Sequence, residues 1–271
     1  GYKAGYAINH DDADGAVLIG YQAGMSLTQS EGVYIGWNAG ADADTATVNA
    51  IQNIYIGNET GRYLDDGTHN TAIGYNAMRS SDSDGQNANN NVAVGTNALL
   101  AITDGDKNVA VGSSAGVAVN TGEYNTLVGY ASAPSLTDGG SNVVIGAQAL
   151  NAGTSGMNNN VVIGAAAGYL LNHSSADDNV IIGSGAGYGG TDNFSRNIAI
   201  GRGALDATSG NTQEGTLAIG WYSLTDLTSG ASNTAVGYQS GKALTTGASN
   251  TAIGYNALLT HTTGARNIAI G

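Results

Sequence analysis

Aromatic side chains recur directly after a repeated glycine, and rings at regular spacing form a surface that can stack on sugar faces. An amide follows several of these rings, as in Tyr21-Gln22 and Trp37-Asn38. If the rings face outward, ring and amide together could bind a glycan, whereas rings that face a second chain would be packing. We take six of them as candidate glycan contacts: Tyr21, Trp37, Tyr75, Trp221, Tyr238 and Tyr255.

Aspartates gather in the polar segments between these positions, and clustered carboxylates are oxygen ligands that suit Ca²⁺. The chain contains no EF-hand loop and no Gly-Gly-x-Gly-x-Asp nonapeptide. Solvated turns are therefore the expected role of these acids, no cofactor is expected, and calcium is the alternative. The clusters are Asp11, Asp12 and Asp14; Asp42 and Asp44; Asp65 and Asp66; Asp82 and Asp84; Asp104 and Asp106; and Asp177 and Asp178.

The sequence does not indicate an enzyme. A polysaccharide depolymerase would need paired carboxylates, but the acids lie in segments of variable length and no pair recurs on a predicted strand. The histidines lie in four separate segments, without the spacing of a metal site or of a Ser-His-Asp arrangement. They are His10, His69, His173 and His261.

The composition argues against several classes of partner. The 271 residues carry a formal charge of -13 with only 8 Lys and Arg, so no basic stripe is available to neutralise phosphates. No apolar run approaches the roughly 20 residues that a membrane-spanning helix needs. We therefore expect neither nucleic-acid binding nor membrane insertion by this segment. The absence of cysteine excludes disulfides and fits an extracellular fibre.

A repeat accounts for the whole chain. A glycine preceded by Ile or Val occurs fifteen times, and seven of the fifteen intervals, counted from Gly1, equal the one from Gly95 to Gly112. A period of about 17 residues, kept along the whole chain, is typical of stacked coils. We predict one repetitive domain of about 15 coils over residues 1–271. We expect this domain to be a segment of a longer fibre. The glycines are Gly20, Gly36, Gly57, Gly74, Gly95, Gly112, Gly129, Gly146, Gly164, Gly183, Gly201, Gly220, Gly237, Gly254 and Gly271.

The three residues before each glycine predict a short β-strand. Apolar or β-branched residues stand one and three places before it, as in Val109 and Val111, which indicates one buried face. The residue between them is also apolar, as in Ala110, so the opposite face is not made for water either. Because a solenoid has a single interior, the second apolar stripe predicts a partner along the length of the chain.

Asparagine stands four places before the glycine in twelve copies. Stacked coils would bring these amides within hydrogen-bonding distance of one another, at about 4.8 Å per coil. We therefore expect a structural ladder rather than a metal or glycan site. Its members are Asn53, Asn70, Asn91, Asn108, Asn125, Asn142, Asn160, Asn179, Asn197, Asn233, Asn250 and Asn267.

The strand pattern Asn-x-Ala-Ile/Val-Gly, clearest in residues 197–201, 233–237, 250–254 and 267–271, resembles the head repeats of YadA-like trimeric autotransporter adhesins. Similar repeats with longer arms occur in phage tail fibres. The resemblance implies a left-handed parallel β-roll of three intertwined chains with binding surfaces outside. The commonest period here is longer than that of the adhesin repeats, and the arms vary in length, which favours a fibre.

We therefore expect an all-β, left-handed parallel β-roll or β-solenoid that forms an intertwined homotrimer. Its expected role is a non-enzymatic structural fibre segment of the phage tail-fibre or virion type, a spacer and display surface for host attachment. The alternatives are a bacterial surface adhesin head that binds glycan or matrix, a repetitive extracellular filament subunit and, less favoured, a depolymerase fibre. The expected partners are copies of itself and a cell-surface glycan or protein receptor, and the expected location is extracellular, on a virion or a bacterial surface.

Overall fold

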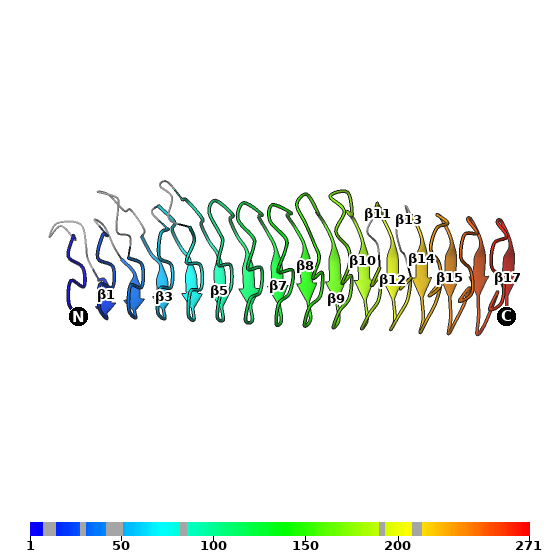
Figure 1. Ribbon diagram of the computed structural model, residues 1–271, viewed down its shortest axis with the longest axis horizontal. Helices are drawn as coiled ribbons and strands as arrows, with labels where there is room; N and C mark the ends of the chain where they lie inside the picture. The colour runs from blue at the N-terminus through cyan, green and yellow to red at the C-terminus, as the bar shows by residue number, and fades with distance from the viewer. Residues whose placement is uncertain are drawn as a thin grey trace. The chain divides into compact units, whose positions relative to one another are not determined.

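The computed structural model describes residues 1–7, 15–27, 31–41, 51–64, 66–81, 86–189, 193–207 and 213–271. In these residues the regular structure is short parallel strands joined by turns, without a helix (Figure 1). The prediction of an all-β solenoid is confirmed, with hydrogen-bonded residues of adjacent coils such as Asn91 and Asn108 standing 17 residues apart. The chain divides into two compact units, Gly1–Ala131 and Ser132–Gly271.

The first unit contains seven three-residue strands that pair in chain order. Equivalent residues of consecutive repeats stand opposite each other, as Val92, Val109 and Thr126 do. The strands are β1 (Val17–Ile19), β2 (Val33–Ile35), β3 (Ile54–Ile56), β4 (Thr71–Ile73), β5 (Val92–Val94), β6 (Val109–Val111) and β7 (Thr126–Val128).

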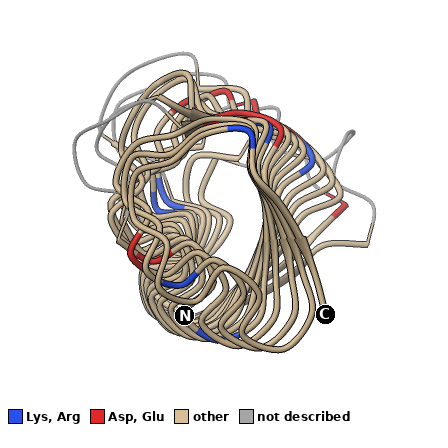
Figure 2. Cartoon of the chain, turned by 90° about the vertical axis from the view of Figure 1, so that its right-hand side faces the viewer, with Lys and Arg blue, Asp and Glu red and all other residues tan. Residues whose placement is uncertain are grey.

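The second unit contains eight strands of the same kind, and a parallel pair of two-residue strands, β11 (Phe194–Ser195) and β13 (Gln213–Glu214), lies in its arms. None of the three-residue strands in either unit holds a charged residue, so Lys, Arg, Asp and Glu lie in the connecting segments (Figure 2). The eight strands are β8 (Val143–Ile145), β9 (Val161–Ile163), β10 (Val180–Ile182), β12 (Ile198–Ile200), β14 (Leu217–Ile219), β15 (Thr234–Val236), β16 (Thr251–Ile253) and β17 (Ile268–Ile270).

The repeated glycine is required by backbone geometry. Gly164 has φ +136°, and a Cβ atom there would lie 2.6 Å from the carbonyl carbon and oxygen of Gly183 in the next coil. An L-residue is strained at such a φ and would also force the coils apart. The glycine thus turns the chain sharply at the end of each strand and lets adjacent coils approach closely.

The orientation of the strands differs from the sequence expectation. The central residue of each strand, such as Ala110 or Val144, points into the coil and is buried, except in the first and last strands. The residues on either side of it, which the sequence analysis took as the buried face, lie on the outside, as Val111 and Ile145 do. The physical reason is space: many central residues are alanine, which suits a narrow interior, while the larger β-branched residues stack on one another outside.

Two positions in each coil share the interior volume. In most coils a large strand centre is accompanied by glycine four residues after the repeated glycine, and an alanine centre by Leu or Met there; the exceptions are Ala110 with Gly116, Leu127 with Ala133, Val144 with Leu150, and Ala235 with Gly241. Examples of the first kind are Tyr34 with Gly40, Tyr55 with Gly61, and Ile181 with Gly187; examples of the second are Ala72 with Met78, Ala93 with Leu99, and Ala199 with Leu205.

The glycines of the first kind make room directly. A Cβ atom on Gly61 would overlap the ring of Tyr55, and one on Gly40 would overlap that of Tyr34. At Gly116, whose strand centre is Ala110, the space is taken by Leu127 of the adjacent coil, 2.5 Å from the Cβ position. The core is therefore filled by complementary sizes rather than by one repeated side chain.

Candidate functional site

The asparagines form a column of buried hydrogen bonds that links successive coils. In the first unit the side-chain oxygen of Asn91 accepts from the backbone N–H of Asn108 at 2.8 Å and from its side-chain nitrogen at 3.2 Å. The side-chain nitrogen of Asn108 also donates to the carbonyl oxygen of Gly122, at 2.7 Å. Each amide therefore ties a strand both to the coil before it and to the arm of the coil after it, a link that spacing alone did not predict.

The column is interrupted in the second unit, where Thr216 replaces asparagine. Its backbone N–H still donates to the side-chain oxygen of Asn197 at 2.9 Å, but its hydroxyl oxygen is buried without a partner among the described residues. The role of the column is structural, because its atoms are saturated by one another and by the backbone.

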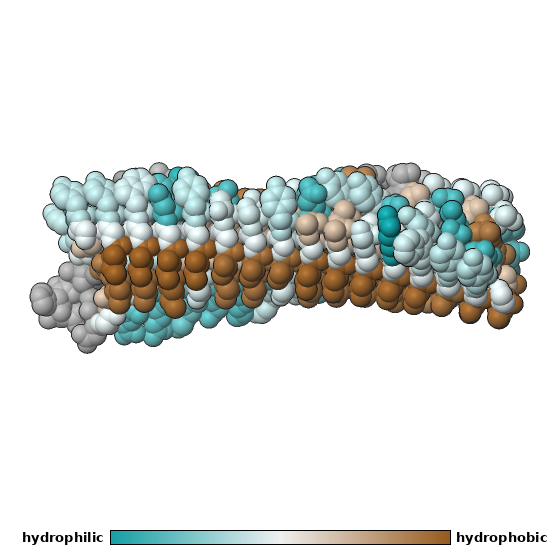
Figure 3. Space-filling view, turned by 90° about the horizontal axis from the view of Figure 1, so that it is seen from below, coloured by the Kyte–Doolittle hydropathy of each residue, from teal (hydrophilic) through white to brown (hydrophobic). Residues whose placement is uncertain are grey.

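The outward residues of the strands form an aliphatic band, defined here as the first and third residues of every three-residue strand. The band is mostly Val and Ile, and none of its side chains is buried in either unit. Ile73 is 38% exposed and Val111 is 37% exposed. Because equivalent residues pair in register, the band continues from coil to coil within each unit (Figure 3).

Exposed rings line up across the glycine corner from the band. Tyr21 stacks on Trp37 with centroids 6.3 Å apart in the first unit, and Tyr238 stacks on Tyr255 at 5.2 Å in the second. Trp221 faces the guanidinium of Arg202, whose Cζ lies 5.3 Å from the ring centroid. The six predicted rings are all exposed, from 42% at Tyr238 to 71% at Tyr255. Four of the six predicted rings thus form short outward stacks, and the glycan contact of all six stays a prediction.

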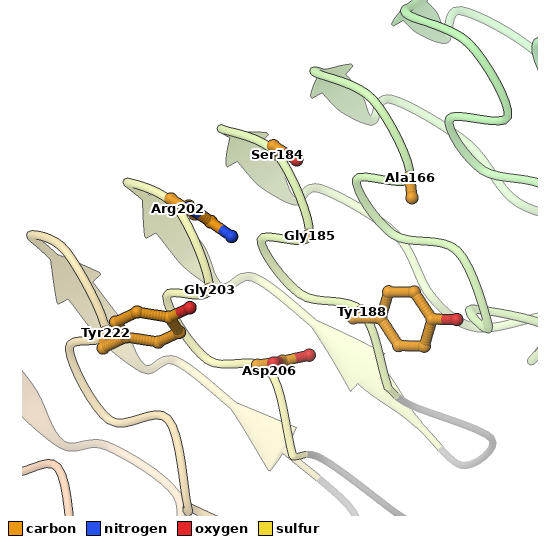
Figure 4. A pocket seen from close by; sticks show the side chains of 8 residues that line it. All are labelled: Ala166, Ser184, Gly185, Tyr188, Arg202, Gly203, Asp206 and Tyr222. Atoms are coloured by element: carbon orange, nitrogen blue, oxygen red, sulfur yellow. The ribbon is translucent and has the colours of Figure 1, made fainter.

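A hollow of about 290 Å³ opens on the surface of the second unit (Figure 4). Its floor is made of small residues, Ala166, Gly185 and Gly203, at the second position after the repeated glycine. Other copies carry Gln or Asn at this position, as at Gln148 and Gln239. The hollow exists because successive coils lack that side chain.

Two tyrosines stand at the sides of the hollow. Tyr222 lies against Gly203, so that a Cβ atom there would be 2.5 Å from Cε1 of the ring. Tyr188 is held parallel to Tyr169, with ring centroids 5.1 Å apart and planes 6° from parallel. Stacking thereby fixes the orientation of one wall, and close packing on glycine fixes the other.

Opposite charges border the same hollow. Arg202 and Asp206 both line it (Figure 4). Among the residues that the structure describes, no carboxylate lies within ion-pair distance of the Arg202 guanidinium. Partial burial raises the pKa of the Asp206 carboxyl above its ordinary value, and the nearby charge of Asp226 adds to the shift. This site was not predicted from the sequence; the signal present in the sequence is the pair Gly185 and Gly203, at a position where other copies carry longer side chains such as Gln148 and Gln239.

Several aspartates of the predicted clusters accept hydrogen bonds from backbone N–H groups. Oδ1 of Asp106 accepts from the backbone N–H of Asn89 at 2.7 Å, and Oδ1 of Asp177 accepts from that of Asn158 at 2.7 Å. Within the described ranges, no three His, Asp or Glu side chains are grouped as a metal site would require. Some of the predicted acids, and one histidine, lie outside the described residues: Asp11, Asp12, Asp14, Asp42, Asp44, Asp65, Asp82, Asp84 and His10.

Comparison of the chain with protein-family models and with curated proteins found no match. In the part of the chain that the structure describes, no helix is long and apolar enough to cross a bilayer.

Proposed function

We propose that the chain is a structural fibre segment whose copies associate side by side through the aliphatic band. The observation that carries this proposal is the band itself: a continuous row of outward Val and Ile side chains in each unit. Soluble monomers rarely expose contiguous apolar patches beyond a few hundred Å². A row that extends over seven strands in one unit and eight in the other favours burial against another molecule.

Burial of the band side chains would stabilise the association at each coil. Complete burial of a Val or Ile side chain stabilises by about 1.5–3 kcal/mol, and the more exposed band residues, such as Ile73 and Val111, still expose more than a third of their surface. Covering two band residues of that exposure would therefore contribute about 1–2 kcal/mol. The contributions of successive coils reinforce one another, since all of them face the same partner.

Copies of the same chain are the partner that fits best. The band repeats once per coil, at the strand spacing of about 4.8 Å. A second copy repeats at the same spacing, so all coils of a unit can meet equivalent coils at once. A partner without this period would match only a few of them.

The resemblance to YadA-like heads and tail fibres sets the proposed number of chains at three. It also supports the proposed setting, an extracellular fibre of a virion or bacterial surface that serves as spacer and display surface. The stacked, exposed rings of Tyr21 and Trp37 and of Tyr238 and Tyr255 support the adhesin-head alternative, in which the same scaffold binds a glycan or matrix.

Sedimentation equilibrium tests the association. The protomer has a mass of 27.0 kDa, and we expect a species about three times heavier that persists on dilution. A well-folded protein that sediments as the protomer at all concentrations would contradict association through the band. A mass of two protomers would keep the band as an interface and contradict the threefold assembly. Mass that grows without limit with concentration would indicate the filament alternative.

A further inference from the structure

The hollow of the second unit is not used by the proposed association, and its lining has the chemistry of a ligand site. At about 290 Å³ it lies just below the range for small-molecule pockets, which is about 300–1,000 Å³. It combines two aromatic walls, Tyr188 and Tyr222, with one cation and one carboxylate. A site of this size admits a single ring rather than an extended chain.

The walls favour a sugar ring over other small ligands. Sugar rings present C–H faces that pack on aromatic rings, and the orientation of Tyr188 is already fixed by its stack on Tyr169. The glycine floor at Gly185 is open, with no atom within 4 Å of a Cβ position, so a ring could approach the backbone. Preorganised walls and floor lower the cost of binding.

The polar groups fit sugar hydroxyls. A hydroxyl group both donates and accepts, so one sugar can donate to the Asp206 carboxylate and accept from the Arg202 guanidinium. Arg202 is available for this because its contact is with the face of Trp221 rather than with a carboxylate of the described residues.

The charge balance selects among sugars. Asp206 and Asp226 place two acids near the hollow, against the single cation Arg202. The whole chain also carries a formal charge of -13. An anionic sugar would meet net repulsion, whereas a neutral one would not.

We infer that the hollow bounded by Tyr188, Arg202, Asp206 and Tyr222 binds one neutral hexopyranose unit. This inference does not require the proposed association, because every residue that lines the hollow belongs to the second unit of one chain. Binding of a single ring should be weak, with a Kd on the order of 1 mM.

The test is titration of the full chain with the methyl pyranosides of glucose, galactose and mannose, followed by ligand-observed NMR. The decisive variant is Gly185→Gln, which restores the side chain type that other coils carry at this position. Gln148 adopts φ 55° there and Gly185 has φ 63°, so the substitution suits the backbone. We expect at least one neutral sugar to bind and Gly185→Gln to weaken it at least tenfold. Tyr188→Ala should weaken it similarly.

Matched controls separate the hollow from the rest of the surface. Ser114→Gln makes the same change at the equivalent position of the first unit, where φ is 57°, and should leave binding unchanged. Tyr75→Ala removes an exposed ring outside the hollow and should also have no effect. Circular dichroism of each variant establishes that it is folded.

Three results would overturn the inference. One is that none of the three neutral sugars binds. Another is that glucuronate binds while the neutral sugars do not, which would assign the hollow to an anionic ligand. The third is that binding survives both Gly185→Gln and Tyr188→Ala, which would place the sugar outside the hollow. Sedimentation measures the association through the band, and the titration measures sugar binding in the hollow. Failure of one proposal is therefore distinguishable from failure of the other.

Discussion

The side-chain oxygen of Asn160 accepts two hydrogen bonds from Asn179, from its side-chain nitrogen at 2.9 Å and from its backbone N–H at 3.1 Å. The same side-chain nitrogen of Asn179 donates to the carbonyl oxygen of Phe194 at 2.7 Å. One fully buried amide therefore connects three successive coils. Its loss should be felt by more than one of them.

We predict that Asn179→Ala lowers the free energy of unfolding by about 2–4 kcal/mol, because it leaves buried backbone groups without partners. Urea denaturation followed by circular dichroism measures this change. The matched control is Asn151→Ala, which removes an amide that is only half-buried and should change stability by less than about 0.5 kcal/mol. Equal effects of the two substitutions would show that the column does not stabilise the coil.

Charge placed on the aliphatic band should dissociate the assembly without unfolding the coil. The double variant Ile73→Lys and Val111→Lys puts two lysines on strands that are not adjacent, which limits repulsion within one chain. We expect it to sediment as the 27.0 kDa protomer with an unchanged circular dichroism spectrum. Association through the band becomes unfavourable because it would bury the unpaired charge of each lysine.

The control for the band variant is Thr96→Lys with Ser113→Lys. These residues are exposed and lie in neighbouring coils of the first unit, but each is the first residue after a repeated glycine and is not part of the band. This double variant should keep the mass of the assembly. Loss of assembly in both double variants would point to net charge rather than to the band.

The shared interior volume predicts strong coupling between Tyr55 and Gly61. Gly61→Leu alone should be severely destabilising because its Cβ overlaps the ring of Tyr55 and its φ is +61°. Tyr55→Ala alone should cost about 3–5 kcal/mol through the cavity that it leaves. The double variant reproduces the alanine-and-leucine arrangement of Ala93 and Leu99, so it should be more stable than the sum of the single effects predicts, by about 1–3 kcal/mol. Strict additivity in a double-mutant cycle would contradict size complementarity.

Asp206 predicts a specific pH dependence. Its pKa is raised in the folded state by partial burial and by Asp226, so folding favours the protonated form. Stability from this group is present below the ordinary Asp pKa and is lost as the pH rises through the raised folded value. Asp206→Asn should therefore be slightly more stable than the parent at neutral pH and equal to it near pH 3. Because Asp206 is only half-buried, solvent screening keeps the difference below about 1 kcal/mol.

Thermal unfolding of the parent and the variant across this pH range measures the effect. Asp178→Asn, a substitution at an exposed carboxyl that does not line the hollow, is measured in parallel as a control. Asp226→Asn should reduce the effect by removing the second cause. A gap between parent and Asp206→Asn that widens toward acid pH would have the wrong sign.

The sequence was sufficient for the period, the strands and the stacked amides, because these depend on residues that recur at fixed positions, such as Gly164 and Asn179. It was not sufficient to say which strand face lies inside, since both faces are apolar. The discriminating signal was the reciprocal change between strand centre and the fourth residue after the glycine, as in Tyr55 with Gly61 against Ala93 with Leu99. Only two positions that face the same interior would compensate in this way.

The hollow was harder to predict because it arises from the absence of a long side chain at the second position after the repeated glycine. Gly185 and Gly203 are unremarkable in a chain with 43 glycines. Their meaning depends on which neighbours project past them, and Tyr188 and Tyr222 belong to different repeats. The positions of the candidate rings at the glycine corners followed from the pattern, but their exposure and their stacking partners did not.

Among the described three-residue strands of each unit, every strand contacts only its immediate neighbours in the sheet. Repeats of equal length are therefore exchangeable: removing residues 95–111 would join two coils already shaped to meet. Recombination between such similar stretches of a gene can lengthen or shorten the array one coil at a time. The length of the array is therefore a heritable quantity, and it can change while each coil keeps the shape of its surface.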